Sequence, residues 1–217
     1  MAANAFELDS SGVGGRIGPN AIIRLREALL SSVGPERARR IFEQAGQSRY
    51  LTQLPEQMVA EADVTQLYTS LPAHLGPRLA AEVSGHAGWL TGDYLLANRI
   101  PAPVQALLHL LPAPLAARVL LAAIRKHAWT FVGSGRFDAR PAPGNAGSGT
   151  DGRRARLLLR VECCPICAGS LQAAPACSYY AASFEALFLA LVHGRTRVRE
   201  VACHALGAPA CTFEVRW

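Results

Sequence analysis

The chain has 217 residues, of which half are hydrophobic and only 18% are charged. This composition excludes an intrinsically disordered protein and allows a sizeable core. The formal net charge is +6, carried by arginine except for Lys126. Because the arginines are scattered and accompany no nucleic-acid-binding motif, we expect no nucleic acid as partner. The absence of an apolar run of about 18 residues and of a secretory signal favours a cytoplasmic protein without a transmembrane segment.

The segment 1–18 is rich in glycine and serine, and we expect it to be flexible. A single ligand-binding domain follows over residues 19–217. Its first part, 19–130, is mainly helical, because apolar residues recur at helical spacing between glycine and proline breaks. The predicted helices cover residues 19–32, 35–47, 55–70, 72–98, 103–111 and 113–129.

The second part of the domain, 131–217, changes to strands around one helix. The predicted elements are a strand over 130–137, a loop over 140–153, a strand over 155–162, a helix over 183–194 and strands over 196–203 and 211–217. In the last strand apolar and polar residues alternate, as in a strand with one buried face. The predicted fold is therefore α/β (α+β), with N-terminal helices packed on one face of an antiparallel sheet and a ligand cavity between these layers.

The cysteines gather in the last quarter of the chain, at Cys163, Cys164, Cys167, Cys177, Cys203 and Cys211. In a cytoplasmic protein such clustering favours a metal site over disulfides. One compatible zinc set is a Cys-x2-Cys pair with two later cysteines: Cys164, Cys167, Cys203 and Cys211. The other compatible set has three sulfurs and one carboxylate: Cys177, Glu200, Cys203 and Cys211. Buried free thiols and an iron–sulfur cluster are the remaining interpretations.

The segment from Cys177 to Cys211 resembles the 4-vinyl reductase domain, a small-molecule-binding domain with a Bet3-like fold that is related to the sensor domains of phenol-responsive regulators. The matching residues are Cys177, Tyr179, Gly194, Glu200, Cys203, Gly207, Cys211 and Phe213. In the phenol sensors three cysteines and one glutamate at these spacings hold one zinc. The resemblance thus implies a structural zinc held by Cys177, Glu200, Cys203 and Cys211. It leaves Cys163, Cys164 and Cys167 without a role.

Three further segments, 92–101, 110–137 and 163–169, resemble the members of this family that serve bacteriochlorophyll biosynthesis in purple photosynthetic bacteria. The resemblance implies a tetrapyrrole ligand, either a Mg-porphyrin or a chlorophyllide. Neither Gly12-x-Gly14-Gly15 nor Gly133-Ser-Gly135 joins a strand to a helix as a nucleotide-binding turn does, and zinc has no redox chemistry. We therefore expect a carrier or chaperone for pathway enzymes. The alternatives are a 4-vinyl reductase acting on a chlorophyllide-type intermediate and a non-catalytic scaffold.

The pocket for a macrocycle should be flat and apolar, and a chelated metal favours histidine as its axial ligand. His86 and Trp89 share one face of a predicted helix, and His127 and Trp129 lie just before the predicted loop. We predict that these four residues contact the tetrapyrrole. Bet3-like proteins dimerise through helices, so the resemblance also implies a homodimer.

Overall fold

The computed structural model describes residues 14–142, 155–172 and 174–217. Residues 1–13 of the expected flexible segment and residues 143–153 of the expected loop lie outside these ranges. The first part of the chain is mostly helical, in the order β1 (Arg16–Ile17), α1 (Asn20–Val33), α2 (Pro35–Gln44), α3 (Arg49–Thr52), β2 (Val59–Ala60), α4 (Glu61–Leu75), α5 (Pro77–Asn98), α6 (Ala102–Leu110), α7 (Ala113–Lys126) and α8 (Trp129–Val132). The second part contains β3 (Arg136–Pro141), β4 (Ala155–Glu162), α9 (Ser178–Leu191), β5 (Arg197–Ala202), the short 3-10 helix η1 (His204–Leu206) and β6 (Cys211–Arg216).

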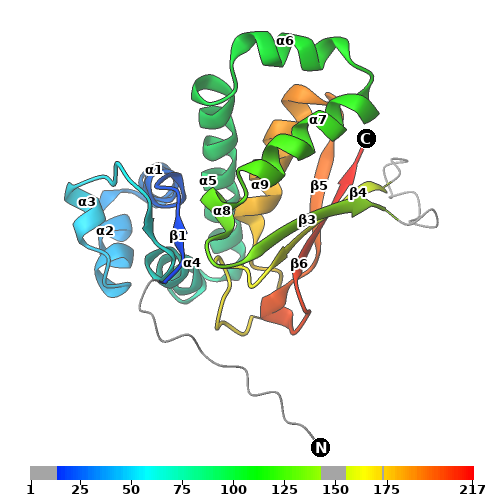
Figure 1. The fold of residues 1–217 in the computed structure, drawn as a ribbon. Coiled ribbons are helices and arrows are strands. Elements are labelled where there is room, and N and C mark those ends of the chain that lie inside the picture. The colour runs from blue at the N-terminus through cyan, green and yellow to red at the C-terminus, as the bar shows by residue number, and fades with distance from the viewer. Residues whose placement is uncertain (1–13, 143–154, 173) are drawn as a thin grey trace, which may run out of the picture.

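The main sheet has four antiparallel strands in the order β3-β4-β6-β5, so β6 lies between β4 and β5 (Figure 1). Phe213 on β6 is opposite Leu159 on β4 and Glu200 on β5. Cys211, Phe213 and Val215 are all fully buried, as the alternating pattern of this strand predicts. The structure confirms the mixed architecture of helices with an antiparallel sheet.

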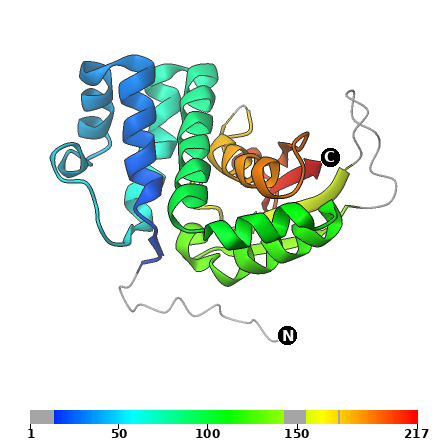
Figure 2. The same ribbon diagram turned by 90° about the horizontal axis from the view of Figure 1, so that it is seen from above.

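The helices form successive layers on one side of the sheet rather than a single layer. Helix α9 lies against the sheet, α5 packs on α9, and α1 packs on α5 (Figure 2). The prediction that the N-terminal helices themselves cover the sheet is therefore corrected for α1, α2 and α4. Helix α9 takes that place because its aromatic side chains pack on the strands: the rings of Tyr180 and Phe184 both contact the ring of Phe213.

Helices α5 and α9 approach closely because α5 presents glycine at their contact. A Cβ atom on Gly88 would lie 2.2 Å from the carbonyl oxygen of Tyr179. A Cβ atom on Gly92 would lie 2.4 Å from the Cβ atom of Ala186. The Ser183 hydroxyl of α9 donates a hydrogen bond to the Gly88 carbonyl at 3.1 Å. This seam joins the helical part of the chain to the sheet.

Several element boundaries differ from those predicted. Helix α4 continues through Pro72 and ends at Gly76, whose φ of 76° suits glycine. Residues 129–132 form a helical turn instead of a strand, and β3 begins only at Arg136. At the N-terminal end, β1 pairs with β2, so residues 16–17 of the segment expected to be flexible are part of a two-stranded ribbon. Within the described ranges, every helix is too short or too polar to span a bilayer.

Candidate metal centre

A tight turn after β4 carries the first two cysteines of the centre. The backbone N–H of Cys167 donates to the carbonyl of Cys164 at 3.4 Å, with Pro165 in the second position, where proline favours a turn. Cys163 adopts a positive φ of 50°, which redirects the chain as it leaves the strand. The Thr65 hydroxyl of α4 donates to the Pro165 carbonyl at 2.7 Å and holds the turn against the helices.

The remaining donors come from three other places in the fold. Cys177 immediately precedes α9, and Glu200 lies on β5. Cys203 follows β5, and Cys211 opens β6. The connection between these two cysteines is the short helix η1 followed by Gly207, whose φ of 85° is left-handed. This compact connection brings the two Sγ atoms to 4.0 Å.

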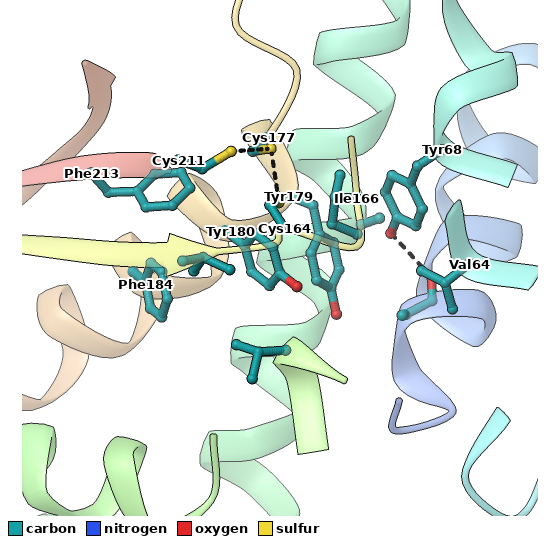
Figure 3. Packing of buried hydrophobic residues seen from close by; sticks show 14 of the residues in the cluster. Val64, Tyr68, Cys164, Ile166, Cys177, Tyr179, Tyr180, Phe184, Cys211 and Phe213 are labelled. Carbon is teal, nitrogen blue, oxygen red and sulfur yellow. Dashed lines mark hydrogen bonds between the residues drawn. The ribbon is translucent and has the colours of Figure 1, made fainter. Parts of the chain in front are cut away.

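The sulfur atoms of the cluster have the spacing that a common metal ion requires. The Cys177 Sγ lies 3.4 Å from the Sγ of Cys164 and 3.4 Å from that of Cys211 (Figure 3). The Cys167 Sγ lies 3.5 Å from that of Cys211. Tetrahedral zinc with Zn–S bonds of about 2.3 Å places its sulfur ligands roughly 3.8 Å apart. All five cysteines of the cluster are fully buried: Cys164, Cys167, Cys177, Cys203 and Cys211.

Two overlapping groups of four donors occur in the described part of the chain, and within each group all ligand atoms lie within 4.8 Å of one another. The first group is Cys164, Cys167, Cys177 and Cys211. The second group is Cys177, Glu200, Cys203 and Cys211. The second is the set that the family resemblance implies, and its role in metal binding stays a prediction. The first differs from the set suggested by spacing alone, because Cys177 takes the place of Cys203 beside the Cys-x2-Cys turn.

The carboxylate of Glu200 is poised for a cation. Its Oε2 accepts a hydrogen bond from the Cys177 backbone N–H at 2.9 Å, whereas its buried Oε1 has no hydrogen-bond partner among the described residues. Burial, together with the nearby Cys203 sulfur, raises the pKa of Glu200 to about 8. The sulfurs of Cys164 and Cys167, and burial, likewise raise the pKa of the Cys177 thiol. Without a cation these groups retain protons, so a divalent ion would replace protons here.

The predicted tetrapyrrole contacts all lie at the surface. His86 and Trp89 are on an exposed face of α5, and His127 and Trp129 lie at the junction of α7 and α8. A groove of about 550 Å³ lies where α5 meets α6, lined by residues 93, 96–102 and 105. Asp93 is one and two turns beyond Trp89 and His86 on the same helix face. The groove therefore continues the face that carries one predicted pair and not the other.

A second cavity, of about 230 Å³, lies between α4, α5 and the cysteine turn. Between α9 and the sheet, where a ligand cavity was expected, the side chains of Tyr180, Phe184 and Phe213 pack in ring-to-ring contact. The expected position of the cavity is therefore corrected: both cavities border α5. Sequence patterns missed the groove because they do not show how α5 and α6 meet.

The model of the 4-vinyl reductase domain family matches residues 157–217, which contain every donor of the cluster. Over 201 residues the chain is 43% identical to the bacteriochlorophyll synthase 23 kDa chain of Cereibacter sphaeroides, covering 92% of this chain and 90% of that protein. It is 35% identical over 201 residues to the protein of the same name from Rhodobacter capsulatus, covering 91% and 85%. The chain belongs to the bacteriochlorophyll synthase 23 kDa chain family.

A solved structure outside the 23 kDa chain family has a similar fold. An H-NOX protein from S. oneidensis in the Fe(II)NO ligation state aligns with a TM-score of 0.53 at 10% identity, covering 92% of this chain and 98% of that chain. At this identity the likeness concerns the fold alone. The phenol-responsive sensory domain of the transcription activator PoxR with phenol aligns with a TM-score of 0.47 at 18% identity, covering 76% and 79%.

Proposed function

We propose that this chain binds a tetrapyrrole intermediate of bacteriochlorophyll biosynthesis, a Mg-porphyrin or a chlorophyllide, and delivers it to the enzymes of that pathway. The observation that carries this proposal is the 43% identity, over 92% of the chain, to a bacteriochlorophyll synthase 23 kDa chain. The similarity includes both the helical part and the cysteine cluster. The ligand site and the metal site are therefore proposed as features of one functional unit.

The groove between α5 and α6 is the place where we propose the macrocycle binds. Its volume of about 550 Å³ lies within the usual range of roughly 300–1,000 Å³ for small-molecule sites. Leu96 and Ile100 offer apolar contact, and the exposed Arg99 offers a guanidinium for a propionate. His86 lies about 10 Å from Asp93 along the same helix, at 1.5 Å per residue. A flat ligand on this face would reach Trp89 for stacking and His86 for axial coordination.

The metal cluster supports a carrier rather than a redox enzyme. Its five sulfur-bearing residues are fully buried, so a large substrate cannot contact them. Zinc with four protein ligands has no open coordination position and no redox chemistry of its own. When bound, the ion would link the cysteine turn, the start of α9 and the end of β5. We propose that it maintains the sheet region rather than acting on the ligand.

The proposal includes a homodimer formed through helices α6 and α7. These helices expose large apolar side chains: Val104, Leu107, Leu110, Leu115 and Val119. Clusters of this kind on a protein surface mark contact sites. Sedimentation equilibrium tests this part: the unsubstituted chain should sediment as a dimer and Leu107→Asp as a monomer. A monomeric unsubstituted chain would exclude this assembly without affecting ligand binding.

The experiment that tests the carrier is a titration of the zinc-loaded protein with magnesium protoporphyrin and with divinyl chlorophyllide, followed by absorbance and fluorescence, with and without NADPH. We expect a saturable one-to-one spectral shift and an unchanged pigment after NADPH is added. Conversion of the divinyl to the monovinyl pigment would instead establish a 4-vinyl reductase. A protein that binds neither pigment would be a scaffold.

The ligand position is tested by histidine variants with two related porphyrins. His86→Ala should weaken binding of magnesium protoporphyrin about tenfold, a loss of ~1.4 kcal/mol, because an axial ligand is lost. The same variant should leave metal-free protoporphyrin unaffected, since that porphyrin has no metal to coordinate. His127→Ala is the matched comparison on α7. If only His127→Ala weakens the magnesium form, the ligand binds at the α7–α8 junction and not in the groove.

A further inference from the structure

The two donor groups share Cys177 and Cys211, and this overlap leaves more ligands than one zinc ion can use. Six donor residues surround one point in the fold: Cys164, Cys167, Cys177, Glu200, Cys203 and Cys211. A structural zinc takes four of them. If the family set is occupied, Cys164 and Cys167 remain as a fully buried pair in contact with two of its ligands.

We propose that the chain binds two zinc ions, bridged by the thiolates of Cys177 and Cys211. The ligands of one ion are Cys164, Cys167, Cys177 and Cys211, and those of the other are Cys177, Glu200, Cys203 and Cys211. Each ion is then tetrahedral, and the two tetrahedra share one edge. This inference extends the zinc site of the proposed function and does not depend on tetrapyrrole binding.

The sulfur positions fit an edge shared by two tetrahedra. The bridging pair, Cys177 and Cys211, has its Sγ atoms 3.4 Å apart, close to the roughly 3.8 Å that two sulfurs on one zinc adopt. On one side, Cys164 lies 3.4 Å from Cys177, and Cys167 lies 3.5 Å from Cys211. On the other side, Cys203 lies 4.0 Å from Cys211. Each bridging sulfur thus has a terminal ligand within tetrahedral range.

The fold separates the two pairs of terminal ligands. Cys164 and Cys167 lie on the turn after β4, whereas Glu200 and Cys203 lie at the end of β5. The bridging residues come from between them, at the start of α9 and the start of β6. Strand β6 lies between β4 and β5 in the sheet, which places Cys211 where it can serve both ions.

The charge balance allows the second ion. With one zinc on the family set, three thiolates and one carboxylate carry four negative charges against two positive ones, which leaves a net charge of minus two. A second zinc brings two positive charges and displaces the two thiol protons of Cys164 and Cys167. The net charge therefore remains minus two, so the second ion adds no net buried charge. Its binding forms two terminal and two bridging Zn–S bonds and releases two protons to solvent.

Native mass spectrometry and elemental analysis of the full chain, purified with zinc, give the decisive stoichiometry. We expect two zinc ions per chain. The double variant Cys164→Ser/Cys167→Ser should hold one. Cys163→Ser is the matched control, because this exposed neighbour belongs to neither donor group, and it should keep two. One zinc in the unsubstituted chain, or two in the double variant, would overturn the proposal.

A cobalt titration provides an independent count that does not require the variants to fold. The sulfur-to-cobalt charge-transfer absorption of the unsubstituted chain should rise until two equivalents are bound, and that of the double variant until one is bound. Saturation of the unsubstituted chain at one equivalent would contradict the second site. Iron with inorganic sulfide in the purified chain would replace the zinc pair by an iron–sulfur cluster. Pigment binding in the double variant should equal that of the unsubstituted chain, which keeps this test separate from that of the carrier.

Discussion

The helical layers and the cysteine-bearing sheet region are held together by different kinds of interaction. In the helical layers, fully buried apolar side chains such as Leu25, Leu29 and Phe42 form the interior. In the sheet region, the aromatic core lies next to a cluster of buried thiols and a carboxylate whose pKa is raised to about 8. Apolar packing is sufficient for the first region, whereas the second buries groups that are costly without a partner. The comparison indicates that the fold is completed by a metal ion only on one side.

The same division separates the two proposed activities. The candidate tetrapyrrole contacts His86 and Trp89 lie on α5, in the helical layers. The metal donors all lie within residues 157–217, which match the 4-vinyl reductase domain. The two regions meet along the contact of α5 with α9. Variants in one region should therefore leave the other function intact, except where they disturb this contact.

Metal removal should give the largest effect and should be confined to one region. Stripping the ion with a chelator should lower the Tm by about 10 °C or more, since losing ~5 kcal/mol of metal binding shifts the Tm by roughly 2–4 °C per kcal/mol at this chain length. Hydrogen exchange measured by mass spectrometry should show loss of protection in residues 163–177 and 203–211. Amides of α1 and α2 should remain protected.

Uniform loss of protection in the stripped protein would mean that the two regions fold as one unit, and the comparison would fail. Unchanged exchange would mean that the buried thiols need no ion. Adding zinc back should restore protection in the same segments. Cys163→Ser should behave as the unsubstituted chain in this experiment, because its side chain is exposed and outside both donor groups.

Gly88→Ala should have the next largest effect, because it strikes the seam between the regions. The added methyl would overlap the Tyr179 carbonyl oxygen at 2.2 Å, so α5 and α9 must move apart. We expect a loss of about 2–3 kcal/mol in the free energy of unfolding, as for other overpacked sites, measured by urea denaturation.

Gly85→Ala on the same helix is the matched control for this seam. The nearest atom to its Cβ would be the Ser178 Cβ at 3.9 Å, an ordinary contact. The better helix propensity of alanine should make this variant more stable by about 0.5–1 kcal/mol. If Gly88→Ala were equally stable, the glycine would not be what sets the distance between the two helices.

The sequence predicted the elements better than their arrangement. Periodicity located the long helices and the alternating strand β6, because each depends on its own residues. It ended a helix near Pro72 rather than at Gly76, since a proline signal does not show that this helix continues. It also placed N-terminal helices on the sheet. Helix α9 lies there because Tyr180 and Phe184 contact Phe213, a long-range match that spacing does not reveal.

The candidate metal site divides in the same way. The family resemblance grouped Cys177, Glu200 and two later cysteines, which the structure also brings together. Spacing alone recognised the Cys-x2-Cys pair at Cys164 and Cys167 but assigned it the wrong neighbours. Which cysteines meet depends on β6 lying between β4 and β5, and this strand order is a property of the assembled sheet. The surface positions of the predicted histidines and tryptophans could not be derived from helix spacing either.

Tyr50→Phe should give the smallest of these effects and should remain within the helical layers. The Tyr50 hydroxyl donates to the Asp63 carboxylate at 2.6 Å, and Arg49 pairs with the same carboxylate. Losing one buried hydrogen bond to a charged group should cost about 1–2 kcal/mol of unfolding free energy. Tyr94→Phe is the control, because the aromatic face that contacts Arg24 at 4.9 Å is kept. The zinc content of Tyr50→Phe should not change, and a variant that lost metal as well as stability would show that the helical layers and the cysteine cluster are energetically coupled.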